Sequence, residues 1–269
     1  MTRKLITLGI ATLVVVAGVS ASLAQSPART QEPVPQPAGK GMVAIQHAAG
    51  AGRYLFVFFW KEKSQQTDAM WDVFQSTMNK VTDRAEVVAI HTPDPAERAI
   101  VARFGIDRSP LPLVLAIAPN GAITKGFPLK CDETQLLKAM VSPVTAECLK
   151  ALQSRKLVLL CIQTRSPYFR QVSLQPGVAD FVADTRFAGA TEIVSLDPAD
   201  PAEASFLQNL QVDPRSNTTV TVLLAPPGSV VGKFAGTVSK EQLVAKLQTA
   251  QSNPCAGGKC GPGGCGPKR

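Results

Sequence analysis

Apolar and polar residues follow the same order twice along this chain. In the first copy, residues 54–60 form a continuous apolar run, as expected of a strand that is covered on both faces. Met70, Phe74 and Met78 recur at helical spacing, and residues 87–90 form another short apolar run. The pattern therefore predicts a buried strand, a helix and a second buried strand, in that order.

Further segments complete the pattern in both copies. In the first copy they are helices at 42–49, at 100–104 and around Leu136 and Met140, and strands at 113–118 and 122–127, joined by the hairpin turn Asn120-Gly121. In the second copy they are helices at 146–152, 178–182, 206–210 and 243–247, and strands at 157–162, 193–196, 220–225 and 230–234. Each copy is therefore predicted to be an α/β unit that ends in a β-hairpin and a helix.

A four-residue motif gives the register between the two copies. Asp-Pro-Ala-Glu at 94–97 recurs at 200–203, and the preceding strands 86–90 and 192–196 match without a gap. Self-similarity of this kind indicates that one domain has been duplicated. The predicted domains are residues 41–143 and 144–250, each large enough for its own core.

The N-terminus has the features of an export signal. Arg3 and Lys4 precede an apolar run at 5–19, and Ser22-Leu23-Ala24 is a small-x-small cleavage site. A membrane anchor is the alternative, but the run is shorter than the roughly 20 residues of a spanning helix. We predict a cleaved signal at 1–24, a periplasmic or secreted bacterial location, and no stable membrane span after cleavage.

The segments outside the two domains have unusual compositions. Residues 25–40 hold four prolines among polar residues and are predicted to be a disordered linker. Residues 251–269 are predicted to be a flexible tail rich in glycine and cysteine. The formal net charge is +8, and Lys and Arg are dispersed among Asp and Glu. A nucleic-acid partner is not expected, because phosphate binding requires a concentrated basic surface.

The order β-α-β-α followed by a β-hairpin and a helix resembles the thioredoxin fold. Phe59 and Trp60 end the first strand and Pro112 enters the hairpin, as in that superfamily. The resemblance covers most of residues 41–250. It implies two tandem thioredoxin-like domains, each with a central mixed sheet flanked by helices.

The resemblance also shows which reactive residues are missing. Thioredoxin-like oxidoreductases carry Cys-x-x-Cys after the Phe-Trp strand, and counting from Trp60 places Ser64 and Thr67 at the two cysteine positions. Their hydroxyls do not form disulfides, so dithiol exchange is unavailable there. We expect both to cap the following helix, since His47 and His91 offer no evident base for a nucleophilic serine.

Pro112 matches the cis-proline of the resembling family, whose preceding backbone pairs with extended substrates. Thr219 takes its place in the second copy, where residues 216–219 align with residues 109–112. The second copy is thus further from a redox ancestor.

Three cysteines fall within the domains. Cys161 is predicted to be a buried thiol, although a disulfide between Cys148 and Cys161 could form in an oxidising compartment. Cys131 precedes a helix start, which could lower the pKa of its thiol. A structural role is nevertheless favoured, because its counterpart in the second copy is Val238.

The tail spaces Cys255, Cys260 and Cys265 five residues apart. These thiols could bind a soft metal such as Cu(I), or Zn(II), or could form mixed disulfides with a partner. Three ligands at this spacing are not a standard zinc pattern, so a tail without metal is the favoured interpretation.

The function predicted from these features is non-catalytic. The chain should bind a protein or peptide of the cell envelope or act as a scaffold there, without a cofactor in its domains. Two alternatives stay open: a thiol-disulfide oxidoreductase that uses Cys131 or the tail cysteines, and a soft-metal-binding protein that uses the tail.

Overall fold

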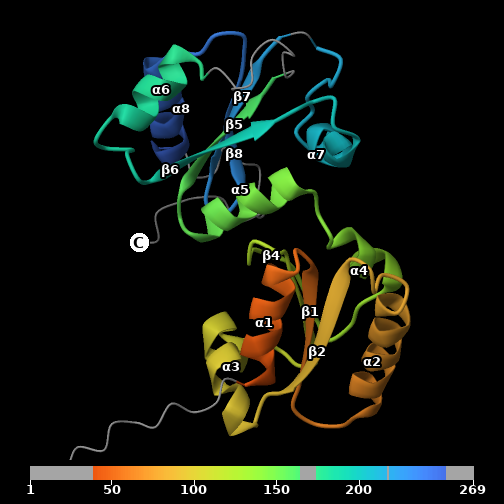
Figure 1. Ribbon diagram of the computed structural model, residues 1–269. Helices are drawn as coiled ribbons and strands as arrows, with labels where there is room; N and C mark the ends of the chain where they lie inside the picture. Colours follow the sequence, from red (N-terminus) through yellow and green to blue (C-terminus); the bar gives the residue numbers. More distant parts are fainter. Residues whose placement is uncertain (1–38, 164–173, 217, 253–269) are drawn as a thin grey trace, which may run out of the picture. The chain divides into compact units, whose positions relative to one another are not determined.

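The computed structural model describes residues 39–163, 174–216 and 218–252, which form two four-stranded sheets with flanking helices (Figure 1). This confirms the predicted fold class of two tandem thioredoxin-like domains. The predicted signal, most of the predicted linker and the cysteines of the tail lie outside the described residues. None of the described helices is long and apolar enough to cross a membrane.

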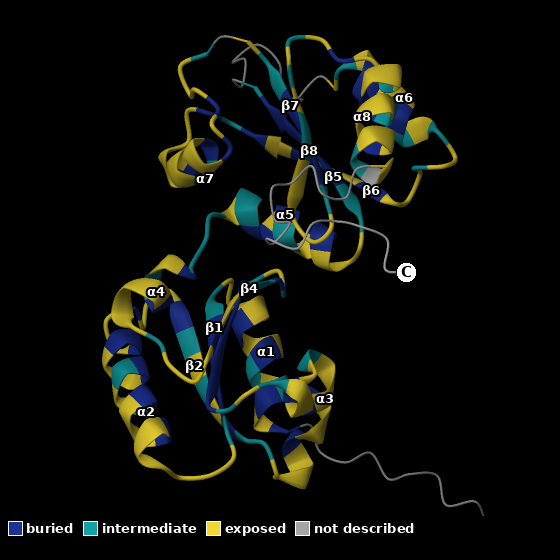
Figure 2. Ribbon diagram, turned by 180° about the vertical axis from the view of Figure 1, so that it is seen from behind, coloured by how far each residue is buried: buried dark blue, intermediate teal, exposed yellow. Residues whose placement is uncertain are grey.

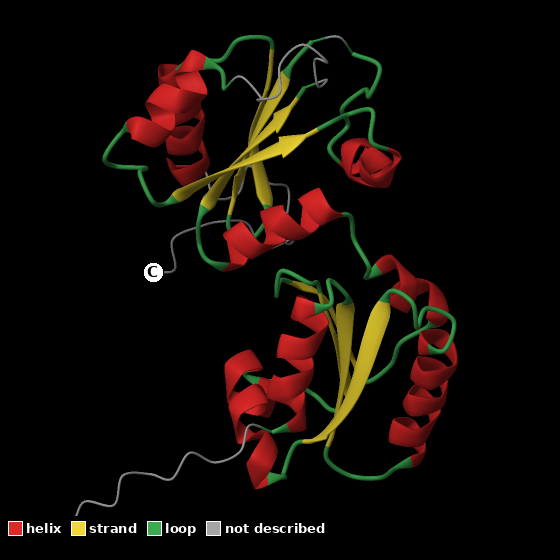
Figure 3. Ribbon diagram, viewed as in Figure 1, coloured by secondary structure: helices red, strands yellow, loops and turns green. Residues whose placement is uncertain are grey.

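The elements of each domain follow one another along the chain in the predicted order, and Figure 3 distinguishes the helices from the strands by colour. The first domain contains α1 (Lys40–Gly50), β1 (Tyr54–Trp60), α2 (Gln65–Met78), β2 (Ala85–His91), η1 (Pro95–Glu97), α3 (Arg98–Phe104), η2 (Ile106–Arg108), β3 (Leu113–Ile117), β4 (Ile123–Pro128) and α4 (Glu133–Lys138). The second contains α5 (Pro143–Gln153), β5 (Leu157–Ile162), α6 (Pro176–Ala183), β6 (Thr191–Leu196), η3 (Pro201–Glu203), α7 (Ala204–Asn209), β7 (Val220–Ala225), β8 (Ser229–Ala235) and α8 (Lys240–Ser252).

The two sheets have the same topology. The strand order is β2-β1-β3-β4 in the first and β6-β5-β7-β8 in the second. In each sheet the first two strands along the chain are parallel, and the hairpin strands are antiparallel. The first strand of each copy is therefore central, which explains its continuous apolar sequence.

Helices cover both faces of each sheet and enclose two core layers per domain (Figure 2). In the first domain, α1 and α3 pack on the face that carries Val57 and Phe59. Helices α2 and α4 pack on the opposite face, where Phe56 and Phe58 contact Phe74. The second domain repeats this arrangement, with α5 and α7 on one face and α6 and α8 on the other.

One prediction about burial was wrong. The apolar run 87–90 was expected to be a buried strand, but Val87 is 51% exposed and Ala89 is also exposed. The reason is position: β2 is an edge strand, and the described helices leave these two side chains exposed. A short apolar run does not by itself distinguish a central strand from an edge strand.

The duplicated Asp-Pro-Ala-Glu motif has a structural role. In the first domain, the Asp94 carboxylate caps η1 by accepting from the Ala96 amide at 2.9 Å. Glu97 is 4% exposed and accepts from the Gly41 amide at the start of α1. The motif at 200–203 makes equivalent bonds in the second domain. The motif therefore ties the turn after each edge strand to the first helix of its domain.

Candidate binding site at the end of β1

Ser64 and Thr67, which the sequence predicts to stand at the two cysteine positions, form a helix cap. Ser64 is the N-cap of α2, and its Oγ accepts from the Thr67 amide at 3.1 Å. The Thr67 hydroxyl in turn donates to the Glu62 carbonyl oxygen at 3.0 Å. These bonds satisfy free groups at the helix start and fix the conformation of the loop that follows β1.

Neither histidine contacts Ser64. His47 pairs with Glu86, with 2.8 Å between Nδ1 and Oε2. His91 Nε2 lies 3.0 Å from the Lys61 carbonyl oxygen, and its ring packs against Trp60 with 4.3 Å between centroids and 34° between the ring planes. Within the described residues, no titratable side chain hydrogen-bonds to the Ser64 hydroxyl, as activation for nucleophilic attack would require.

A pocket of about 500 Å³ lies beside the segment that precedes β3. We call it the Leu111 pocket; its lining includes Lys61, Thr92, Ile106, Ser109 and Leu111. The Leu111–Pro112 peptide bond is cis, and the Pro112 carbonyl accepts from the Leu129 amide at 2.7 Å. Among the described residues, nothing hydrogen-bonds to the backbone N–H or C=O of Leu111. An extended ligand could therefore pair with this segment.

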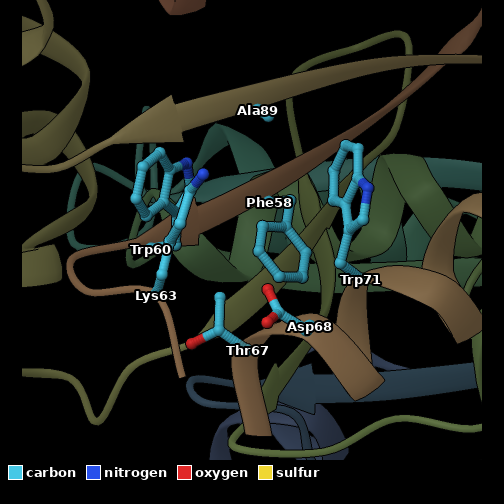
Figure 4. A pocket seen from close by; sticks show the side chains of 7 residues that line it. All are labelled: Phe58, Trp60, Lys63, Thr67, Asp68, Trp71 and Ala89. Carbon is cyan, nitrogen blue, oxygen red and sulfur yellow. The ribbon is translucent and has the colours of Figure 1, made fainter. Parts of the chain in front are cut away.

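A second pocket, of about 350 Å³, lies on the opposite face of the same sheet (Figure 4). Trp60 and Trp71 stand on its two sides with Phe58 between them, and Phe58 and Trp71 meet edge to face at 5.0 Å. Lys63 and Asp68 line it as well. We call it the tryptophan pocket, and it contains both tryptophans of the chain.

Sequence reasoning missed most of the tryptophan pocket. It used Trp60 only as the end of a strand and gave no role to Trp71. The spacing of these residues carries no signal for a pocket, because the cavity depends on which side chains of β2 the helices leave uncovered.

Cys131 does not have the lowered pKa that a position before a helix start could give it. Cys131 lies just before Asp132, the N-cap of α4, but burial raises the pKa of its thiol to about 11. The negative charge of Asp132 adds to this effect. Near neutral pH the thiol is therefore protonated and a poor nucleophile.

This shift predicts slow alkylation of Cys131. In a variant with serine at the three tail positions, iodoacetamide should modify Cys131 about a hundredfold more slowly than a free thiol at pH 8. The rate should keep rising with pH until about 11, because the folded protein retains the proton up to its raised pKa. Peptide mass mapping across a pH series measures this. A rate plateau below pH 9 would contradict the assignment.

The disulfide considered for Cys148 and Cys161 does not form. Both residues are free and buried, and they belong to core layers on opposite faces of the second sheet. Burial raises the pKa of Cys148 to about 12 and that of Cys161 to about 11. The described residues contain no group of three His, Cys, Asp or Glu side chains placed to hold a metal. The candidate ligands Cys255, Cys260 and Cys265 lie outside them.

In the second domain, Thr219 directly precedes β7, as Pro112 precedes β3. The helix-start loop of this domain falls within residues 164–173, outside the described residues. The candidate site is therefore defined by the first domain.

The strand order and the helix placement are thioredoxin-like in both domains, and the cis proline before β3 is a further thioredoxin-like feature of the first domain. No protein-family model matches the sequence, and no curated protein matches it. Similarity to solved structures is confined to the fold.

Three of these structures span one or two such domains. Thioredoxin O2 from Arabidopsis thaliana in the oxidized state is 13% identical, over 37% of this chain and 83% of its own, with a TM-score of 0.31. The first two thioredoxin domains of Eps1p from Naumovozyma dairenensis are 11% identical, over 83% and 97%, with a TM-score of 0.29. Those of Saccharomyces cerevisiae Eps1p are 10% identical, over 81% and 98%, with a TM-score of 0.30.

Proposed function

We propose that this chain is an exported, non-catalytic thioredoxin-like protein that binds an extended segment of a cell-envelope protein at the Leu111 pocket. The observation that carries the proposal is the unpaired backbone of Leu111 beside a pocket of about 500 Å³. An exposed backbone N–H and C=O can bind a peptide main chain, while the pocket accepts a side chain.

The chemistry of the loop after β1 supports binding over catalysis. Ser64 and Thr67 use their hydroxyls to hold the start of α2. Cys131, Cys148 and Cys161 keep protonated thiols near neutral pH. Export and a periplasmic location rest on the N-terminal sequence, and fractionation of the producing cell tests them.

Filling the Leu111 pocket tests the binding function. Ser109→Trp places a large side chain in the lining, and we expect it to weaken the binding of fluorescein-labelled ten-residue peptides about tenfold in anisotropy titrations. Ser216→Trp is the matched control, because Ser216 occupies the corresponding position in the second domain. The affinity of Ser216→Trp for these peptides should stay within about twofold of that of the unchanged protein.

Two results would count against the proposal. One is peptide binding to Ser109→Trp as tight as to the unchanged protein. The other is the absence of any peptide in a diverse library that binds above background.

A further inference from the structure

The edge strand β2 leaves part of its backbone unpaired. The Tyr54 amide donates to the Arg84 carbonyl, and the Thr92 amide donates to the Trp60 carbonyl, at 3.0 and 2.9 Å. Along the parallel ladder between them, the backbone groups of alternate β2 residues face β1. Those of the intervening residues 85, 87, 89 and 91 therefore face outward.

Most of the outward backbone groups at the two ends of this edge are paired, namely both groups of Ala85 and the carbonyl of His91. The Ala85 amide donates to the Val81 carbonyl, and the Ala85 carbonyl accepts from Arg53. The His91 carbonyl accepts from the Asp94 amide. Among the described residues, the outward N–H and C=O groups of Val87 and Ala89 have no partner. Val87 and Ala89, two residues apart along the strand, therefore offer two N–H donors and two C=O acceptors to an added strand.

Two of the other edge strands carry residues that hinder pairing, whereas Val87 and Ala89 on β2 are apolar. The opposite edge of the same sheet, β4, has Lys125 and ends at Pro128. In the second domain, Ser195 on β6 stands where β2 has Ala89. Charged, polar and proline residues commonly protect sheet edges, whereas apolar side chains on an open edge favour an added strand.

The tryptophan pocket begins at the open edge. Ala89 lines it and pairs in register with Phe58 on β1. In Figure 4, Ala89 lies on one side of Phe58 and Asp68 on the other, with the two indoles flanking the path between them. A side chain on a strand added next to Ala89 could therefore cross Phe58 and end near Asp68.

The aromatic rings and the Asp68 carboxylate of the pocket favour a basic side chain. Aromatic faces attract a cation, and a carboxylate at the far end adds a specific partner. Asp68 is exposed and forms no ion pair with any described residue. Lys63 lies along Trp60 at the rim and also has no ion pair there (Figure 4). Its flexible, exposed side chain should compete with an incoming cation.

We propose that β2 and the tryptophan pocket together bind an extended polypeptide segment that carries an arginine. The segment pairs with the backbone of Val87 and Ala89, and its arginine side chain lies between Trp60 and Trp71 with the guanidinium at Asp68. Arginine fits because it stacks on aromatic rings and pairs with a carboxylate. The site goes beyond the proposed function, because it lies on the opposite face of the sheet from the Leu111 pocket.

Tryptophan fluorescence reports on this site directly, because both tryptophans of the protein line the pocket. The probe is acetyl-Thr-Val-Arg-Val-Thr-amide, titrated into the purified protein. We expect saturable quenching by this peptide and binding at least about tenfold weaker when norleucine replaces the arginine. Acetyl-arginine-amide, which cannot form a strand, should bind more weakly than the peptide.

Variants separate the parts of the proposal. Asp68→Asn should weaken binding of the arginine peptide about fivefold and leave the affinity for the norleucine peptide unchanged. Asp180→Asn, which removes the same charge from α6 of the second domain, is the matched control and should have no effect. Lys63→Gln should tighten binding of the arginine peptide about twofold, since it removes the competing cation.

Val87→Pro tests strand pairing. The lost N–H faces outward, so the ladder with β1 is retained, as proline requires at a sheet edge. We expect Val87→Pro to bind the arginine peptide more weakly and to bind acetyl-arginine-amide with unchanged affinity. Thermal unfolding of each variant establishes that it is folded.

Three results would overturn the proposal. They are no quenching by the arginine peptide, equal binding of the arginine and norleucine peptides, and equal binding of acetyl-arginine-amide and the peptide. Ser109→Trp separates the two proposals: measured with a labelled arginine peptide by anisotropy, binding here should survive the substitution that blocks the Leu111 pocket.

Discussion

Replacing Glu203 by alanine should lower the free energy of unfolding of the second domain by about 3 kcal/mol. Glu203 is 1% exposed. Its carboxylate accepts from the Ser142 hydroxyl and from the Val144 amide at 3.2 Å, both at the start of α5. Alanine removes both acceptors and leaves a void, so the helix start loses its partner inside the protein.

Urea unfolding measures this effect domain by domain. Both tryptophans are in the first domain, so their fluorescence reports its unfolding, whereas far-ultraviolet circular dichroism reports both domains. Glu203→Ala should shift only the circular dichroism transition. Glu192→Ala is the control: Glu192 pairs with Lys156 on the surface, and its loss should cost less than about 1 kcal/mol. Equal losses for the two variants would contradict the buried role of Glu203.

Gly177→Ala should destabilise the second domain by a similar amount, about 3 kcal/mol. A Cβ on Gly177 would lie 2.0 Å from the Val238 carbonyl oxygen and 2.7 Å from the Ser239 Cα. Both atoms belong to the backbone before α8, so no side-chain rotation can relieve the clash. Helix α6 must shift, and Phe181 in the core beneath it loses packing.

Alanine at Gly50, in contrast, should not destabilise its domain. Gly50 is the last residue of α1, and an added Cβ meets no atom within 4 Å. Alanine is the better helix former, so Gly50→Ala should leave the first domain unchanged or stabilise it by up to about 1 kcal/mol. Circular dichroism and fluorescence melts of the two variants measure the contrast. A harmless Gly177→Ala would show that α6 does not approach Val238 this closely.

Local patterns predicted the elements well. The continuous apolar run 54–60 predicted β1 with the bounds that the structure shows. A strand covered on both faces is apolar at every position, so its two ends can be recognised in the sequence. The run 87–90 has the same character over fewer residues, and there the prediction of burial failed. Exposure of Val87 depends on what lies beside β2, which no local pattern contains.

The sequence also predicted some features of the candidate site residues and not others. Ser64 and Thr67 could be placed because they follow Trp60 at a fixed distance in the chain. The shift of the Cys131 pKa could not be predicted, because desolvation depends on distant residues that bury the thiol. The Cys148–Cys161 pairing failed because helix and strand positions do not reveal which face of a sheet each thiol occupies.

The sequence by itself determined the duplication and the order of the elements, and through its resemblance to thioredoxins it predicted that Ser64 and Thr67 stand at the two cysteine positions. Each of these follows from spacing along the chain. Only the tertiary structure decided that Glu97 and Glu203 anchor helix starts, that Val87 and Ala89 form an open edge, and that Trp60 and Trp71 face each other across a pocket. Those properties depend on which residues far apart in the chain come into contact and on which side chains stay exposed. Both are determined by how the helices pack on each sheet.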